Sequence, residues 1–294
     1  MRKKALWSTL VVFTAFTCPL QAADSSDLWV ALDTLWVLIA AFMVFFMQAG
    51  FGMVEAGLIR SKNAGNILMK NMMDFCMASL GFFICGYALM FGGEGPLLGS
   101  QGWLLMNVES PVGIPLHAFW MFQAAFCGAA ATIVAGGMAE RMRFVAYLMY
   151  SFVISAVVYP IVGHWIWGGG WLVGLGFYDF AGSSVVHAFG GFSALAAVLV
   201  LGPRKGKYIN GEIRPILGHS MPLATIGVFL LWLGWFGFNG GSVLSADPAA
   251  VSLVFVTTTL AAAAGCMASI FTSYTYLKKP DITMALNGIL AGLV

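Results

Sequence analysis

Charged residues are scarce in this chain. Only 9% of its 294 residues are Asp, Glu, Lys or Arg, whereas a soluble domain carries roughly 25%. Hydrophobic residues make up 60%, and they form runs of about 20 residues rather than heptads or collagen-like triplets. The composition excludes a soluble globular domain, a disordered chain, a collagen and a coiled coil, and it predicts a membrane protein.

The sequence also lacks the motifs of common enzymes and metal sites. It holds no G-x-S-x-G, no H-E-x-x-H, no P-loop and no pair of carboxylates within an apolar run. Its five cysteines include no C-x-x-C pair, which argues against a zinc site or a disulfide framework. A net charge of +2 gives no sign of nucleic-acid binding. We therefore expect no enzymatic activity, no metal, no cofactor and no nucleic-acid partner.

The first 22 residues have the form of a secretory signal peptide. Three basic residues precede an apolar stretch that ends near Leu20, and small residues follow it. We predict that residues 1–22 are removed and that the mature N-terminus lies outside the cell. The alternative is an uncleaved first helix.

Eight apolar segments follow the signal peptide. They lie near 34–58, 71–92, 116–137, 144–166, 183–202, 222–238, 250–277 and 282–294. Seven are long enough to span a bilayer, whereas the last reaches only about 20 Å as a helix, against about 30 Å of hydrocarbon. We predict an all-α polytopic membrane domain over 23–294, with seven full helices and part of an eighth. A loose likeness between 46–52 and 235–241 indicates two halves of opposite topology.

The basic residues beyond the N-terminus are predicted to lie in alternate connections between these segments. They are Arg60, Lys62, Lys70, Arg141, Arg143, Arg204, Lys205, Lys207, Arg214, Lys278 and Lys279. The intervening connections hold no Lys or Arg. By the positive-inside rule the basic connections are cytoplasmic, which agrees with the orientation that the signal peptide predicts.

A few ionisable side chains fall within or beside the apolar segments, where charge is costly. His187 either packs between helices or lines a pore as a hydrogen-bond donor and acceptor. Asp179 caps the helix that follows it, adds negative potential that attracts cations, or does both. Glu55 and Asp74 are expected to make buried polar contacts between helices, with Lys70 as a neighbour of Asp74. His117, His164 and His219 are expected to be interface or packing residues.

The aromatic residues Phe122, Phe126, Trp167 and Phe238 are harder to assign, because most aromatic residues in such a protein pack or face lipid. Trp167 begins a W-G-G-G turn, where its indole can hold a monovalent cation through a contact worth about 2 kcal/mol. Ser242 can supply a hydroxyl acceptor to the same cation.

Residues 179–187 (DFAGSSVVH) closely resemble the signature of the Amt/Rh ammonium transporter family, of the bacterial Amt type. The resemblance extends, in order, over 57–63, 139–143, 167–170, 201–204 and 234–239. It implies the ammonium-transporter fold, a homotrimer of protomers with eleven helices in inverted five-helix repeats, each protomer with its own hydrophobic pore. The second repeat is incomplete here, since the second pore histidine of the family lies beyond residue 294.

The resemblance also implies roles for individual residues. Trp167, Phe126 and Ser242 take the places of the outer ammonium recruitment site, and Phe126 and Phe238 those of the phenyl gate beneath it. His187 takes the place of the first pore histidine, and Asp179 that of a structural acid required for transport.

The function implied is ammonium transport across a bacterial inner membrane, with cation recruitment followed by deprotonation and with methylammonium as an analogue. A PII-type regulatory protein at the cytoplasmic face is an expected partner. One alternative is an ammonium-sensing domain of a signalling protein. A gas channel of the Rh type fits less well, because the positions of Trp167 and Ser242 are intact.

Overall fold

The computed structural model describes residues 25–294, so the expected signal peptide lies outside the described residues. Within them, seven helical segments are long and apolar enough to cross a membrane. They are α1 (Ser25–Leu58), α2 with α3 (Ala64–Gly81 and Tyr87–Phe91), α4 (Leu116–Met138), α5 with α6 (Phe144–Val153 and Tyr159–Trp167), α8 (Phe189–Leu201), α9 (Met221–Gly241) and α10 (Pro248–Leu277). The shorter α11 (Ile282–Leu293) follows, and α7 (Trp171–Gly174) is a single turn. The predicted multi-pass helical fold is confirmed.

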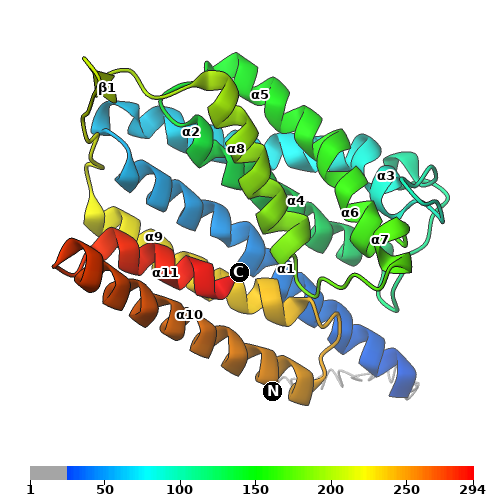
Figure 1. The fold of residues 1–294 in the computed structure, drawn as a ribbon. Coiled ribbons are helices and arrows are strands. Elements are labelled where there is room, and N and C mark those ends of the chain that lie inside the picture. The colour runs from blue at the N-terminus through cyan, green and yellow to red at the C-terminus, as the bar shows by residue number, and fades with distance from the viewer. Residues whose placement is uncertain (1–24) are drawn as a thin grey trace, which may run out of the picture.

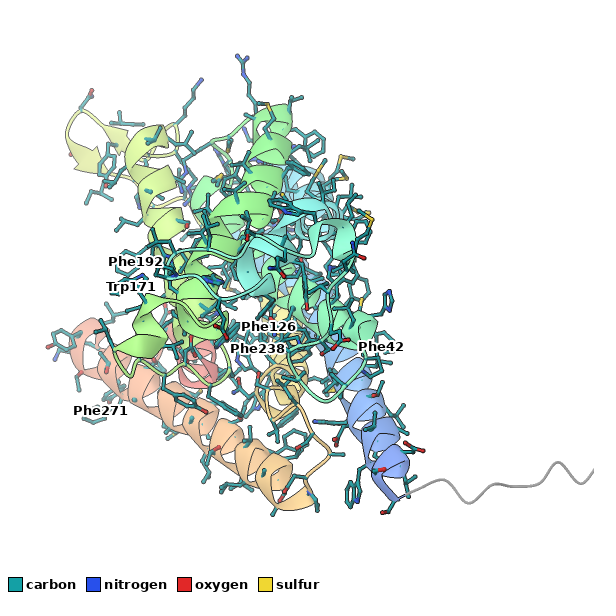
Figure 2. All side chains as sticks on the ribbon, turned by 90° about the vertical axis from the view of Figure 1, so that its right-hand side faces the viewer. Phe42, Phe126, Trp171, Phe192, Phe238 and Phe271 are labelled. Atoms are coloured by element: carbon teal, nitrogen blue, oxygen red, sulfur yellow. The ribbon has the colours of Figure 1, made fainter. Side chains whose placement is uncertain are left out.

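The helices run side by side, with α1 and α4 in the middle and the α9, α10 and α11 layer along one edge (Figure 1). The basic connections that contain Arg60, Arg141 and Arg204 lie at one end of the bundle, here called the inner end. The opposite end, which holds the long connector between α3 and α4, is the outer end. Figure 2 shows Phe126 and Phe238 close together in the interior, whereas Phe192 and Phe271 project from the surface.

Glycine lets α1 and α9 approach closely. A Cβ added at Gly57 of α1 would lie 2.5 Å from the carbonyl oxygen of Ser220, and one at Gly227 of α9 would lie 2.8 Å from the carbonyl oxygen of Gly50. Small residues at such crossings replace the hydrophobic driving force that lipid does not provide between helices. The α1–α9 pair therefore forms a tight seam along the interior.

Three helices contain a π-helical turn, namely Phe82–Gly86, Ile154–Val158 and Ser183–Ala188. Such turns change the local hydrogen-bond register and occur often at functional sites. Around the second turn, the Cys85 thiol donates to the carbonyl oxygen of Ala156 at 3.3 Å, and the Cys127 thiol contacts that of Ser155 at 3.6 Å. The third turn carries His187.

A short hairpin projects from the inner end. Strand β1 (Tyr208–Ile209) pairs antiparallel with β2 (Glu212–Ile213), so that Tyr208 lies opposite Ile213. Asn210 and Gly211 both have positive φ, as a two-residue hairpin turn of the Asn-Gly type requires. The sequence reading had not anticipated this element.

The placement of Lys70 in a connection between spans was wrong. Helix α2 begins at Ala64 rather than near residue 71, and Lys70 is buried within it. Its Nζ donates to the carbonyl oxygen of Met142 at 3.0 Å and lies 4.9 Å from the centre of the Tyr147 ring. Asp74 instead accepts hydrogen bonds from the Tyr147 and Ser151 hydroxyls, and it forms no ion pair with Lys70 among the described residues.

Glu140, in the connection between α4 and α5, joins three connections at the inner end. Its buried carboxylate accepts from Arg60 Nε and Arg204 Nη1, both at 2.9 Å, and from Asn63 Nδ2 at 2.7 Å. Burial by itself raises the pKa of Glu140, but the hydrogen bonds from these three residues outweigh it and lower the pKa from 4.5 to about 2. The side chain is thus held ionised as a clasp between α1–α2, α4–α5 and α8–α9.

Candidate functional site

A pocket of about 600 Å³ opens at the outer end between α4, α6, α9 and α10. Its walls are mainly aromatic and aliphatic, with a few polar groups among them. The lining that concerns the site consists of Phe122, Gln123, Phe126, Trp167, Asp179 and Ser242. The structure therefore brings together Trp167, Phe126 and Ser242, the three residues predicted for cation recruitment.

Trp167 ends α6 and its side chain is held in one orientation. The indole Nε1 donates to the carbonyl oxygen of Asp179 at 2.7 Å. Gly182, at φ +114°, passes so close that an added Cβ would lie 3.2 Å from the Trp167 ring. The ring edge also meets Phe126, with centroids 6.1 Å apart. Because the indole donor is already used, the ring presents its face and edge to the pocket rather than its N–H.

His164 anchors α6 to neighbouring segments of the chain. It is fully buried, and its two ring nitrogens lie 2.7 Å from the carbonyl oxygens of Met90 and Gly95. These contacts tie the helix that carries Trp167 to α3 and the outer connector. The packing role expected for His164 is confirmed. His219 is exposed, although its Nδ1 contacts the carbonyl oxygen of Ile59 at 2.9 Å.

Ser242 lies just past the last turn of α9. Its hydroxyl donates to the carbonyl oxygen of Phe238 at 2.8 Å. With its proton engaged, the oxygen retains lone pairs that can accept a further hydrogen bond. The side chain is therefore an acceptor on the pocket wall, which suits a ligand that only donates.

The inner wall of the pocket is a closed pair of phenyl rings. Phe126 of α4 and Phe238 of α9 stack with centroids 4.0 Å apart and an angle of 26° between their planes (Figure 2). Both side chains are about 99% buried, and Phe122 packs against Phe126 at 4.5 Å. No passage exists between rings at van der Waals contact, so one of them must rotate to admit a molecule.

Asp179 makes the contacts expected of a helix cap. Its Oδ1 accepts from the backbone N–H of Gly182, and its Oδ2 accepts from those of Ser184 and Val185, all at 2.8 Å. These groups belong to the start of the π-helical turn, where the backbone N–H groups lack partners within the helix. One carboxylate therefore sets the conformation of the turn that carries His187.

His187 lies immediately beyond the phenyl pair. Its imidazole stacks on Trp235 at 5.2 Å and 18°, and its centroid is also 5.2 Å from that of Phe238. The Nε2 atom is buried without a hydrogen-bond partner among the described residues. A buried polar atom left free in an apolar channel is costly to desolvate. This atom is free to form a hydrogen bond with a small polar molecule.

A second cavity, of about 470 Å³, lies at the inner end. Sequence reasoning missed it, and also missed Gln123 in the outer pocket and the stacking of Trp235 on His187. Across the described residues, no group of three His, Cys, Asp or Glu is placed to hold a metal ion.

Comparison with known proteins agrees with this geometry. Residues 35–294 match the model of a family described as the ammonium transporter family. The chain belongs to the ammonium transporter family. It is 50% identical over 275 residues to ammonium transporter Amt2 of Archaeoglobus fulgidus, covering 90% of this chain and 58% of that protein. It is 40% identical over 300 residues to ammonium transporter Amt1 of Haloferax mediterranei, covering 94% of this chain and 57% of that protein.

Solved structures of the family superpose on most of this chain. A structure named Sensor Amt Protein aligns with a TM-score of 0.87 at 40% identity, covering 91% of this chain and 68% of that one. Mep2 of Candida albicans aligns with a TM-score of 0.83 at 32% identity, covering 92% of this chain and 61% of that one. The chain thus spans somewhat over half the length of the curated relatives that it matches.

Proposed function

We propose that this protein moves ammonium across a membrane through a pore within each protomer. The proposal rests on three structural features that follow one another along a single path. A pocket with an aromatic face and a hydroxyl acceptor leads to a closed phenyl pair, and a histidine with an unpartnered nitrogen follows it. The relatives named above are transporters by name, and no part of the path resembles a catalytic centre.

Each feature suits ammonium in a particular way. The cation donates to the Ser242 oxygen and lies against the Trp167 ring, which attracts it through the ring quadrupole. A potassium ion can make the second contact but cannot donate a hydrogen bond or lose a proton. Beyond the phenyl pair the surroundings are apolar, so ammonia crosses as a neutral molecule bonded to His187. The proton that the ammonium ion loses moves separately or is returned to the outer side.

The proposal extends to the assembly and its orientation, with the family resemblance as its support. We place the protein in a bacterial inner membrane as a homotrimer, with the signal peptide removed and the mature N-terminus outside. The inner end, with Arg60, Arg141 and Arg204, then faces the cytoplasm. This basic face is where a PII-type regulatory protein would dock.

Substitution of the recruitment tryptophan tests the proposal. In the full-length protein, Trp167→Leu should raise the half-saturation concentration for methylammonium uptake by about 5- to 30-fold, since a partly desolvated cation–π contact is worth about 1 to 2 kcal/mol. Trp171→Leu is the matched control, because Trp171 lies nearby but points outward (Figure 2). An unchanged concentration dependence for Trp167→Leu would place the cation elsewhere.

A sensing role is the second candidate, supported by the 40% identity to the structure named Sensor Amt Protein. In that case the pocket would bind ammonium without net flux. Ammonium-dependent signalling by a protein that gives no methylammonium accumulation would favour sensing over transport.

A further inference from the structure

The inner cavity lies on the same axis as the pore. Its wall includes Ile133 of α4 and Leu231 of α9, which are each seven residues from the gate residues Phe126 and Phe238. Seven residues of helix correspond to about 10 Å. The cavity is therefore about two turns beyond the phenyl pair, on the inner side of His187.

Glu55 is the acidic side chain that lines this cavity. It projects from α1, one turn before the α1–α2 connection. Its Oε2 accepts a hydrogen bond from Asn71 Nδ2 at 2.8 Å, and its Oε1 faces Gly136 of α4, where an added Cβ would lie 3.8 Å away. The absence of a side chain at Gly136 leaves room beside the carboxylate.

Glu55 forms no ion pair with any Lys or Arg of the described part of the chain. Arg204, which lines the same cavity, is paired with Glu140, and Lys70 donates to the carbonyl oxygen of Met142. Arg141 donates to the carbonyl oxygen of Gly202. Lys70 attracts the Glu55 carboxylate electrostatically but is not in direct contact with it. An intramembrane carboxylate with no counter-charge in direct contact is expensive unless a proton or a mobile cation balances it.

Asn71 fixes the Glu55 carboxylate from outside the cavity lining. Its side chain is 97% buried, and its Nδ2 donates to Glu55 and to the carbonyl oxygen of Ile67. A ligand in the cavity that carries positive charge and N–H donors therefore meets a carboxylate held in one orientation.

We infer that Glu55, oriented by Asn71, forms a second cation site at the inner end of the pore, which takes ammonium or a small alkylammonium ion. The inference rests on the proposed transport function. The site mirrors the outer pocket on the opposite side of the gate, with a carboxylate in place of the Trp167 ring. It captures cations that enter or leave from the inner end.

The test compares transport from the two faces of the full-length protein. Uptake of radiolabelled methylammonium is measured in right-side-out vesicles and in inverted vesicles, where the inner end faces the medium. Glu55→Gln removes the charge but keeps the shape. In inverted vesicles it should raise the half-saturation concentration about tenfold, as expected for losing one hydrogen bond to a charged partner, without lowering the maximal rate.

In right-side-out vesicles the same variant should keep the half-saturation concentration within about twofold, since the outer pocket sets it, and lower the maximal rate about tenfold. Both changes lower the ratio of the maximal rate to the half-saturation concentration about tenfold. A passive pathway requires this ratio to fall equally from the two faces. Glu212→Gln, an exposed carboxylate on β2, is the control and should match wild type from both faces.

Asn71→Ala provides a second variant in case Glu55→Gln does not assemble. It should raise the half-saturation concentration in inverted vesicles about threefold. If the wild type shows saturable flux and the assembled variants match it from both faces, Glu55 is a neutral packing residue and the inference is wrong. A wild type with no saturable flux from either face would refute the proposed transport function itself.

Discussion

Replacing Glu140 by Gln should destabilise the protein, and the loss should depend on pH. The carboxylate is fully buried and accepts from Arg60, Asn63 and Arg204, which lower its pKa from 4.5 to about 2. At about 1.4 kcal/mol for each pH unit, that difference corresponds to about 3 kcal/mol of stability at pH 7. Arg60 is 35% exposed, so solvent screening makes this figure an upper value.

The sign of the pH dependence follows from the depressed pKa. The stabilisation is fully present above the ordinary carboxyl pKa of 4.5 and is lost as the pH falls toward about 2. The free-energy difference between wild type and Glu140→Gln should therefore shrink to less than half at pH 3.

Unfolding titrations with SDS in detergent micelles, at pH 7 and pH 3, measure this difference directly. Glu212→Gln serves as the reference for loss of an exposed carboxylate and should change the free energy of unfolding by less than about 0.5 kcal/mol. A Glu140→Gln protein as stable as wild type at pH 7, or a deficit that is the same at both pH values, would show that the clasp contributes nothing as an ion pair.

Three further outcomes are expected. His187→Ala should reduce methylammonium uptake by the full-length protein at least tenfold while assembly is retained. His117→Ala, at an exposed site, should leave uptake unchanged. Wild-type uptake rates in His187→Ala would mean that His187 only packs. Asp179→Ala should lower the thermal midpoint in detergent more than Asp247→Ala, since Asp179 accepts three backbone hydrogen bonds and Asp247 caps α10 with one; equal shifts would contradict this. The cognate PII protein should co-purify with the full-length protein under at least one nitrogen regime, and failure under both replete and starved conditions would remove that partner.

Hydropathy predicted the spans well, because runs of apolar residues depend only on local sequence. It failed at the start of α2, where Lys70 and Asn71 are polar but buried. Their partners are Met142, in the connection between α4 and α5, and Glu55, on α1. A hydropathy profile contains no information about pairing across helices, so it assigned Lys70 to a connection and began the span only at residue 71.

In the candidate site, too, local contacts were predictable from the sequence and contacts between helices were not. The capping contacts of Asp179 were predictable, because the acceptor and its donors lie within six residues. The stacking of Phe126 on Phe238 joins residues on two helices far apart in the sequence, and only the family resemblance pointed to it. Gln123, Trp235 and the Glu55 cavity had no local signal, since each depends on how α1, α4 and α9 cross.

The stacked phenyl pair also bears on the voltage across the membrane. A continuous file of water would carry protons by hopping and would dissipate the gradient that the cell maintains. With Phe126 and Phe238 only 4.0 Å apart between centroids, such a file is interrupted at the rings. Rotation of one ring is a local side-chain motion, whereas the tight α1–α9 seam and the Glu140 clasp hold the helices in place. On the proposed transport path, brief openings of this kind would admit single small molecules without a continuous file of water, so the pore would stay insulating to protons while it conducts.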